Sequence, residues 1–384
     1  MTAQALLKTE SATSSFEVIL DRSVLVRALG HCQGVVERKN TVPILANVML
    51  EARNGQLKMT ATDLEIAFVE TIEAHVSQEG ITTVSAHFLF DIVKKLKDGS
   101  EVLLKLKSET GQLEVKSGKS QFHLATISPE EFPHPNAGDL PYRFTLHAQE
   151  LARLIDRTRF AMATEETRYY LNGIYLHATV DGYLRAVATD GHRLAQAEMD
   201  LPTGAQGLPG VIVSRKTISE LRKLIDEAAT QVEVSLSETQ ICFVLGSSIL
   251  ISRLIEGTFP DYERAIPQSN ESPLEVSVAL FAEAVDRVSI ILNDKARIVK
   301  LHLSPNQLRL LTENQEGGRA SEDIEVTYSG QDMDVGFNSR YILDMTQQMT
   351  GETLQLIFGD ATLPVIARDP LDEHVLYVLM PMRV

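Results

Sequence analysis

Two short segments of the sequence contain residue types that catalysis or nucleotide binding would use. The tetrapeptide at 117–120, Ser-Gly-Lys-Ser, is similar to the end of a phosphate-binding loop, but that loop needs a glycine five residues before Gly118, where Leu113 stands. Asp190 and His192 could act as a general-base pair, yet they flank a glycine at a turn and no nucleophile motif accompanies them. These residues argue against ATP binding and leave a hydrolase built on Asp190 and His192 as the alternative function.

The residues that bind metals or form disulfides are dispersed along the chain. The ten histidines show no spacing that is typical of metal ligands. The two cysteines, Cys32 and Cys242, lie far apart in apolar contexts. We expect two buried free thiols, as is usual in a reducing cytoplasm, and no disulfide. The sequence therefore predicts a non-catalytic protein without a metal or cofactor.

The N-terminal segment carries no sign of export or of membrane insertion. No apolar run approaches the ~20 residues that a membrane-spanning helix needs. Residues 1–15 are polar, with Lys8 as their only basic side chain, and they lack the apolar core and the small-residue cleavage pattern of a signal peptide. We interpret them as a flexible tail on a cytoplasmic protein that does not enter membranes.

The elements that would position these residues form an internal threefold repeat. Each copy opens with a short alternating strand and an amphipathic helix, and the three openings begin at Phe16, Phe144 and Leu274. In the first two copies, matching residues recur at an offset of 127 or 128 positions. Examples are 61–63 with 188–190, both Ala-Thr-Asp, and 132–133 with 259–260, both Phe-Pro.

Each copy is long enough to form a domain of its own. Strands follow the first helix, and a second helix and further strands follow these. The pattern predicts an α+β fold in which two helices lie on one face of a sheet in each domain. The predicted domains span residues 16–141, 142–271 and 272–384, preceded by the tail at 1–15.

Charged residues are unevenly distributed along the chain. The net charge of −16 argues by itself against a DNA-binding protein, because such proteins usually carry a basic patch. The six predicted helical segments nevertheless sum to +6, so the remaining residues carry −22. If the helices share one face, that face attracts a duplex and the other surfaces repel it. The ordinary preference of Lys and Arg for helix surfaces explains the same pattern.

Signals for reading individual bases are missing from the sequence. It contains no zinc-finger spacing, no basic zipper and no RNA-recognition signature. Aromatic residues make up 6% and tryptophan is absent, which argues against platforms that stack on bases. Any binding to nucleic acid should therefore involve the phosphate backbone, without sequence preference.

The turn at 190–194 departs from the repeat. In the first copy, Leu64 stands where the second copy has Gly191. A local function at this turn and a tight Asp-Gly turn of purely structural use both explain the glycine, and the sequence leaves the two interpretations open.

Several longer motifs resemble those of the bacterial DNA polymerase III beta subunit family. The most specific are Ala-Thr-Asp-Gly-His-Arg-Leu-Ala at 188–195, Phe-Pro-Asp-Tyr at 259–262, Thr-Tyr-Ser-Gly at 327–330 and Met-Pro-Met-Arg-Val at 380–384. The segments at 43–45 and 168–173 fit the family as well. The resemblance extends from about Phe16 to the C-terminus.

The resemblance implies three similar clamp domains per chain and a head-to-tail homodimer that forms a closed ring, with helices lining the hole. It implies a DNA sliding clamp, a processivity factor that encircles duplex DNA without sequence preference during replication. The implied partners are the clamp loader and the replicative and repair DNA polymerases, which would bind through short clamp-binding peptides. Such a ring also accounts for the acidic net charge, because only the inner wall needs to be basic.

The resemblance further implies a peptide-binding pocket between the second and third domains. Its residues would be Leu171, Thr189, Gly191, His192, Arg193, Leu194, Pro260, Arg264, Ala265, Asn338, Tyr341, Val378, Met380, Pro381 and Met382. Ala265 is smaller than the branched residue usual at its position, so the peptide preference stays open.

Two further surfaces are expected from the ring. The residues expected to face DNA are basic and lie on helical segments: Arg38, Lys39, Lys94, Lys95, Arg215, Lys216, Arg222 and Lys223. The contact between chains should join Phe122 and Leu124, on an edge strand of the first domain, to Ile290 and Ile291 of the third.

Overall fold

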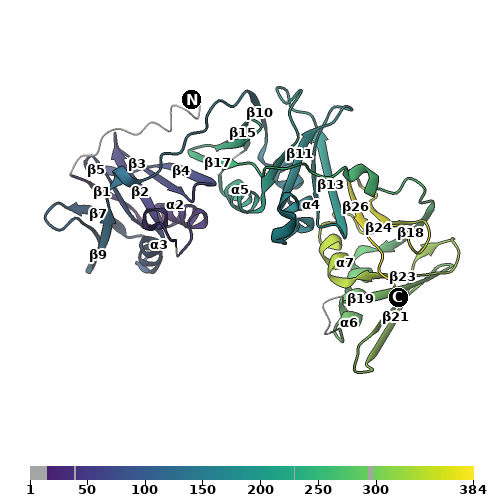
Figure 1. The fold of residues 1–384 in the computed structure, drawn as a ribbon. Coiled ribbons are helices and arrows are strands. Elements are labelled where there is room, and N and C mark those ends of the chain that lie inside the picture. Colours follow the sequence, from purple (N-terminus) through teal and green to yellow (C-terminus); the bar gives the residue numbers. More distant parts are fainter. Residues whose placement is uncertain (1–14, 39, 229, 293–296) are drawn as a thin grey trace. The chain divides into compact units, whose positions relative to one another are not determined.

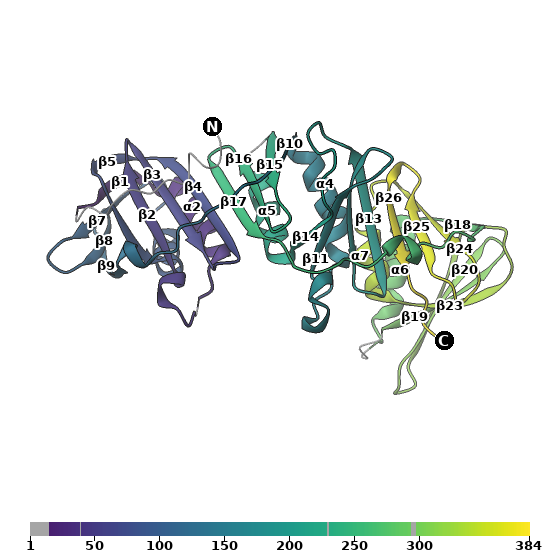
Figure 2. The same ribbon diagram turned by 45° about the horizontal axis from the view of Figure 1, so that its top comes forward.

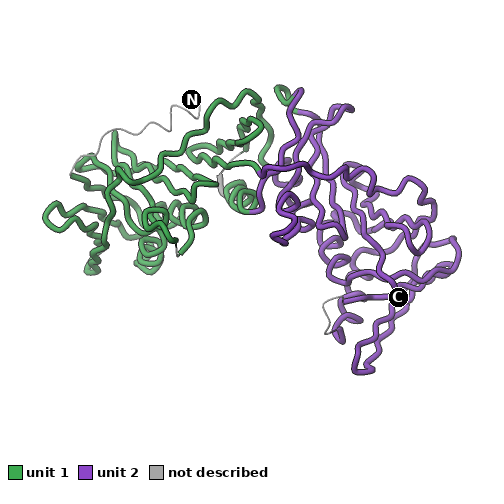
Figure 3. Tube along the Cα trace, viewed as in Figure 1, with its two compact units in different colours: residues 1–149, 202–205, 216–254 green, residues 150–201, 206–215, 255–384 purple. Residues whose placement is uncertain are grey.

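The computed structural model describes residues 15–38, 40–228, 230–292 and 297–384, without the side chains of 226–228. Most of the predicted N-terminal tail, at 1–14, and the predicted DNA-facing Lys39 lie outside the described residues. The chain divides into two compact units (Figure 3). Unit 1 comprises residues 1–149, 202–205 and 216–254, and unit 2 comprises residues 150–201, 206–215 and 255–384.

The first copy of the repeat runs from β1 to β9 (Figure 1). Its helices are α2 (Arg22–Val35) and α3 (Ala86–Lys95), with short 3-10 helices η1 (Pro43–Ala46) and η2 (Pro129–Glu131). Its strands are β1 (Glu17–Asp21), β2 (Asn47–Arg53), β3 (Gln56–Thr62), β4 (Ile66–Glu73), β5 (His75–Gln78), β6 (Gly80–Ser85), β7 (Glu101–Lys107), β8 (Gln112–Ser117) and β9 (Ser120–Ile127).

The second copy runs from β10 to β17 and contributes to both units. Its helices are α4 (Ala148–Thr158), η3 (Arg159–Ala161), η4 (Glu166–Leu171) and α5 (Arg215–Ala228), with η5 (Tyr262–Ala265) following the last strand. Its strands are β10 (Tyr142–His147), β11 (Gly173–Ala178), β12 (Tyr183–Thr189), β13 (Arg193–Asp200), β14 (Val211–Ser214), β15 (Gln231–Leu236), β16 (Gln240–Leu245) and β17 (Ser248–Arg253).

The third copy lies entirely in unit 2. Its helices are α6 (Val278–Ser289) and α7 (Ser339–Thr346). Its strands are β18 (Ser272–Ser277), β19 (Ile298–Ser304), β20 (Gln307–Glu313), β21 (Arg319–Glu325), β22 (Thr327–Tyr328), β23 (Met333–Asn338), β24 (Thr353–Phe358), β25 (Val365–Asp369) and β26 (Asp372–Leu379). All three copies thus follow the predicted order of strand, helix, strands, helix and strands.

Strand pairing repeats along with the element order. In every copy the strand before the first helix pairs antiparallel with the strand after the second helix, as β1 with β7, β10 with β15 and β18 with β24. The residue that precedes the first helix occupies the same register in the first and third copies, where Asp21 lies opposite Glu101 and Ser277 lies opposite Thr353. This shared register makes positions in different copies directly comparable.

Sheets continue across the boundaries between copies. In unit 1, thirteen strands form one sheet in which β4 of the first copy pairs with β17 of the second. In unit 2, nine strands form a sheet in which β13 of the second copy pairs with β26 of the third. A further four-stranded sheet of unit 2 has the order β21-β20-β19-β23. Because these pairings cross copy boundaries, the second copy is divided between the two units.

Helices lie on one face of these sheets. In unit 1, α2 and α5 follow the same face (Figures 1 and 2), and α2 packs on β3, β4 and α3. In unit 2, α6 packs on β20, β21 and α7. Side-chain caps begin several of these helices, since the carboxylate of Asp21, the hydroxyl of Ser277 and the amide oxygen of Asn338 each accept a backbone N–H of the first turn.

The cores are apolar, and the cysteines belong to them. Cys32 and Cys242 are both buried free thiols, as predicted. Burial raises the pKa of Cys32 well above its ordinary value and raises that of Cys242 to about 12, so both thiols stay protonated and unreactive. No helix among the described residues is long and apolar enough to cross a membrane. Within the same residues, no group of three or more His, Cys, Asp or Glu side chains is placed to hold a metal ion.

Candidate functional site

The turn between β12 and β13 is a compact hydrogen-bonded unit. The Thr189 hydroxyl donates to the Arg193 carbonyl oxygen at 2.7 Å and accepts the backbone N–H of Gly191 at 3.1 Å. Asp190 Oδ1 accepts the backbone N–H groups of His192 and Arg193 at 2.9 and 3.0 Å. Gly191 has φ +87°, a conformation that glycine adopts without strain.

The first copy shows what is particular to the turn at Gly191. Its turn at 62–66 makes the same hydrogen bonds, and Leu64 there has φ +79°, so a positive φ alone does not require glycine. A Cβ atom at Gly191, however, would lie 2.6 Å from Nη1 of Arg168. The close approach of the Arg168 guanidinium therefore distinguishes this turn from its counterpart.

The same hydrogen bonds remove the hydrolase alternative. Both oxygens of Asp190 are engaged, Oδ1 by the two backbone groups and Oδ2 by Arg193 Nε at 3.1 Å, while the His192 side chain is exposed. A general-base pair would need the carboxylate to orient the imidazole. Asp190 instead shapes the turn, and the interpretation of Asp190 and His192 as a catalytic pair is not supported.

The C-terminal segment is bound to this turn and to the third copy. β26 pairs with β13, with Val378 opposite Leu194. Just after β26, the N–H of Met380 donates to the His192 carbonyl oxygen at 2.9 Å. The N–H of Met382 donates to the Gly336 carbonyl at 2.8 Å. The Met380 side chain is 40% exposed, so it does not simply close the core of the third copy.

The residues of the predicted pocket differ in burial, and we call the buried ones its floor and the more exposed ones its rim. Leu171, Leu194 and Val378 belong to one buried cluster, together with Phe259 and Tyr262. The rim is formed by residues that are exposed or half-buried: Gly191, His192, Pro260, Arg264, Ala265, Met380, Pro381 and Met382. The remaining predicted residues serve the framework. Thr189 is buried in the turn, Arg193 and Tyr341 stack on each other, and Asn338 caps α7.

A polar network lies beside the buried floor. The His177 ring nitrogen Nε2 lies 3.0 Å from the Tyr262 hydroxyl, to which Arg185 Nη1 donates at 3.0 Å. Arg185 Nε also donates to Glu198 at 2.7 Å. Burial lowers the pKa of His177, so the imidazole is neutral in the folded protein at neutral pH.

The predicted DNA-facing residues fall into two groups. Arg38, Lys94, Lys95 and Lys223 are exposed on or beside α2, α3 and α5 of unit 1. Arg215, Lys216 and Arg222 are only partly exposed.

The half-buried cations make contacts within the fold. Arg215 Nη2 donates to the carbonyl oxygens of Met162, at 2.8 Å, and Ala163. Burial, together with the charge of Arg193, lowers the pKa of Arg215. Lys216 binds the Asp63 carboxylate and the carbonyl oxygen of Val35. For Arg215 and Lys216, the prediction of a role in DNA binding competes with a clear structural role.

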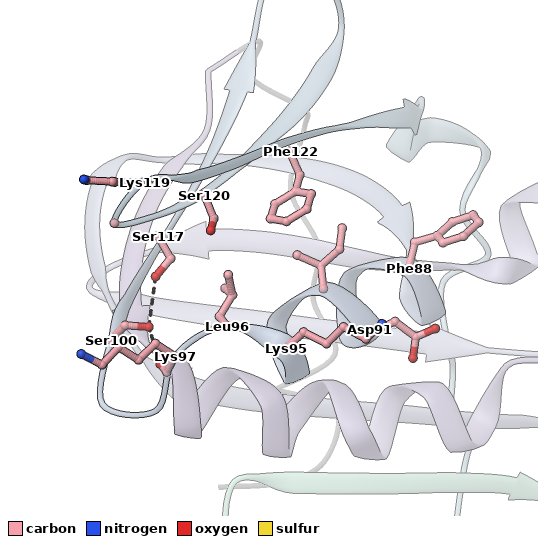
Figure 4. A pocket seen from close by; sticks show the side chains of 12 residues that line it. Phe88, Asp91, Lys95, Leu96, Lys97, Ser100, Ser117, Lys119, Ser120 and Phe122 are labelled. Carbon is pink, nitrogen blue, oxygen red and sulfur yellow. Dashed lines mark hydrogen bonds between the residues drawn. The ribbon is translucent and has the colours of Figure 1, made fainter.

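A pocket of about 540 Å³ lies between α3 and the β8–β9 hairpin of unit 1 (Figure 4). Phe88, Ile92, Leu96 and Phe122 contribute its apolar lining. The tetrapeptide at 117–120 is the hairpin turn and lines the pocket as well, so it does not form a loop at a helix N-terminus that could cradle phosphates.

Among the predicted interface residues, Phe122 lines this pocket and Ile290 is 76% exposed. Leu124 and Ile291 are half-buried, and Ile290 follows directly on α6. Sequence reasoning missed Phe88, which is 67% exposed. Its position on a helix with an otherwise regular apolar face gave no sign of this exposure.

Comparisons with known proteins agree with this architecture. Family models for the N-terminal, central and C-terminal domains of the DNA polymerase III beta subunit match residues 16–136, 145–261 and 263–383. A curated beta sliding clamp from Caulobacter vibrioides (strain NA1000 / CB15N) is 45% identical over 371 residues, which are 96% of this chain and 100% of the relative. The Escherichia coli (strain K12) beta sliding clamp is 38% identical over 369 residues, which are 95% of this chain and 99% of the relative.

Solved structures give the same result. A DnaN sliding clamp from Bartonella birtlesii bound to griselimycin has a TM-score of 0.94 at 45% identity and covers 96% of this chain and 100% of its own. A Pseudomonas aeruginosa sliding clamp bound to griselimycin has a TM-score of 0.91 at 35% identity, with the same coverage. Three domains of mixed α/β type, matched in order over nearly the whole length, show that the chain belongs to the bacterial DNA polymerase III beta subunit family.

Proposed function

We propose that this chain works as a closed ring of two head-to-tail copies around duplex DNA, with its three domains at residues 16–141, 142–271 and 272–384. The family's function is that of this chain: it is a DNA sliding clamp, a non-catalytic processivity subunit of DNA polymerase III. The form of the ring, the contact residues and the individual partners are the parts proposed here.

The pairing rule between copies supports the ring. Twice within the chain, β4 or β13 of one copy pairs with the last strand of the next copy, β17 or β26. By the same rule, β21 of the third copy should pair with the last strand of the first copy in another chain, which is β9. Among the described residues, β21 ends its sheet, and β9 pairs on its outer side only through Thr126 and Ile127. Two free edges that match by rule favour a head-to-tail contact with a second chain, which forms a ring where the rotation between the chains closes.

The helices support the same contact. Within unit 1, Gly34 of α2 lies so close to α5 that a Cβ atom there would be 2.2 Å from a Glu220 oxygen. Ile290 matches Gly34, because each lies 13 residues after the residue that caps its helix, Ser277 for α6 and Asp21 for α2. Ile92 of α3 matches Glu220 of α5 at the repeat offset of 128. Where the contact within the chain joins a glycine to a carboxylate, the contact proposed between chains would join two isoleucines.

The pocket on unit 1 provides space for such a contact. Ile92 and Phe122 line its 540 Å³, and the exposed Ile290 needs an apolar partner. We therefore assign this pocket to the partner's Ile290, with Phe88 at the margin. Burial of these side chains stabilises the ring without any direct affinity for DNA.

Ring closure is tested by retention on DNA. Direct binding should be weak and salt-sensitive, with a log–log slope of about −0.9 for each phosphate neutralised. After loading onto nicked circular DNA by a clamp loader, the ring should survive high salt, and cutting the circle should release it. Equal loss from intact and linearised DNA would exclude encirclement.

The rim and floor at 189–194 and 378–382 are the proposed site for clamp-binding peptides of polymerases and the clamp loader. An exposed methionine beside a pocket floor of leucine and valine suits several related apolar side chains. Two solved relatives are bound to griselimycin, so we propose this compound as a probe. Competition between griselimycin and a labelled clamp-binding peptide, measured by fluorescence polarisation, should show a shared site. Independent binding of the two would refute the assignment.

A further inference from the structure

The guanidinium of Arg193 is held by polar and aromatic groups of unit 2. Nε donates to Asp190 at 3.1 Å, Nη1 to Asp344 at 2.6 Å and Nη2 to the Phe160 carbonyl at 2.6 Å. The Tyr341 ring lies 4.3 Å from its central carbon, and the Phe160 ring 5.2 Å. The Arg193 side chain is 10% exposed.

These contacts change the role expected for Arg193. All three nitrogens donate to oxygen atoms of the protein, and aromatic rings contact the guanidinium. A cation so engaged does not offer a charge to an incoming peptide. It ties the β12–β13 turn of the second copy to α7 of the third, because Asp344 and Tyr341 both lie on α7.

The tie extends to the proposed peptide site. Arg193 ends the turn whose His192 carbonyl accepts the N–H of Met380. Two residues further on, Met382 is bound to Gly336 on β23, which leads into α7. Hydrogen bonds thus join the turn to the C-terminal segment, the C-terminal segment to β23, and the turn to α7. Asp344 is the carboxylate on α7 that accepts from Arg193.

Unit 1 contains the corresponding junction in a simpler form. Asp63 matches Asp190, and its carboxylate binds Lys216 of α5 directly. Ile66 stands in place of Arg193. In both units the turn aspartate therefore helps to hold the second helix of the next copy. In unit 1 Asp63 binds a lysine of that helix directly, whereas in unit 2 Arg193 bridges Asp190 and Asp344 of the helix.

We propose that Asp344 is a positioning residue for the peptide pocket: through Arg193 it holds the turn at 190–193 and the C-terminal segment in the arrangement that accepts a peptide. The proposal rests on the proposed function of this pocket. A residue that acts through Arg193 affects the order of the pocket, so its effect should appear as faster dissociation of the ligand.

The test compares Asp344→Ala with Asp344→Glu and with Asp63→Ala in the full-length protein. Griselimycin is the probe, and surface plasmon resonance gives both rate constants. We expect Asp344→Ala to weaken affinity about tenfold, which corresponds to 1.4 kcal/mol, mainly through dissociation. Asp344→Glu should restore most of the affinity. Asp63→Ala removes the turn carboxylate that holds Lys216 in unit 1 and should lower the melting temperature while leaving griselimycin affinity unchanged.

Two outcomes would overturn the proposal. Unchanged griselimycin binding by Asp344→Ala would show that Asp344 does not position the pocket. An equal loss of affinity in Asp63→Ala would show that the effect follows from general destabilisation. Failure of the unsubstituted protein to bind griselimycin would instead refute the proposed peptide site.

Discussion

Replacing Ile290 and Ile291 with aspartate should convert the ring into single chains. Ile290 is 76% exposed at the end of α6, and its proposed environment is the pocket lined by Ile92 and Phe122. A carboxylate in that pocket would lose hydration and the apolar contacts of isoleucine, while Lys95, Lys97 and Lys119, which also line the pocket, offer it partners.

The size of the effect follows from burial. Removing an isoleucine side chain of this kind from water contributes about 2 kcal/mol. A closed ring contains the contact twice, so loss at Ile290 alone costs about 4 kcal/mol, or roughly a thousandfold in the dimer dissociation constant. The Ile291 change adds to this value and an ion pair between the new carboxylate and a lining lysine subtracts from it, so we expect a change of about a thousandfold for the double variant.

Sedimentation equilibrium over a wide concentration range would measure the dissociation constant. Leu371→Asp is the matched control, because Leu371 is 82% exposed in the β25–β26 turn of the same unit and lies outside the proposed contact. The control should remain dimeric. A double variant that sediments as a dimer at the same concentrations would show that α6 and the unit 1 pocket do not meet.

Three further changes probe the peptide site and the polar network. Gly191→Ala should weaken griselimycin binding because its Cβ, 2.6 Å from Arg168 Nη1, would displace that guanidinium from the turn. Gly182→Ala has the same φ of +87° and no neighbour within 4 Å, so it should cost only about 1–2 kcal/mol of stability. Equal griselimycin binding by both variants would refute the role of Arg168 at this turn. Deleting residues 380–384 should abolish griselimycin binding and keep the dimer, because β26 ends before the deletion; undiminished affinity in a folded truncation would contradict the site. His177 has a lowered pKa in the folded state, so the unfolded chain takes up its proton first and stability should fall as pH drops below about 6.5. His177→Gln should flatten the melting temperature between pH 7 and pH 5, and an unaltered pH profile would exclude this histidine as the cause.

The threefold order of elements was predictable because it depends on local signals. Asn54-Gly55 marks a tight hairpin turn, and both residues have positive φ in the structure. Asp21 precedes an amphipathic run and caps α2. These signals recur at a near-constant offset, so chance agreement at one position has little effect on the whole.

The roles of individual cations were not predictable in the same way. Lys216 looks like an exposed helix residue, but its partner Asp63 is 153 positions away in the sequence. Arg193 belongs to a family motif, yet its contact with Asp344 arises only because β13 and α7 are brought together by the pairing of β13 with β26. Charge on a helix can be counted from a sequence, whereas the oxygen atoms that engage it are set by tertiary structure.

This difference affects how the protein stays on DNA. Of the predicted DNA-facing residues that the structure describes, Arg215 and Lys216 bind groups within the fold and Arg38 and Lys223 pair with Asp91 and Glu220, while the net charge of the chain is −16. Fewer free cations mean fewer phosphates neutralised, a shallower salt dependence and weaker direct binding. A protein of this charge would leave DNA readily if affinity alone held it. A clamp that encircles DNA does not need high affinity to stay bound, because a closed ring must open, or reach a DNA end, before it can dissociate.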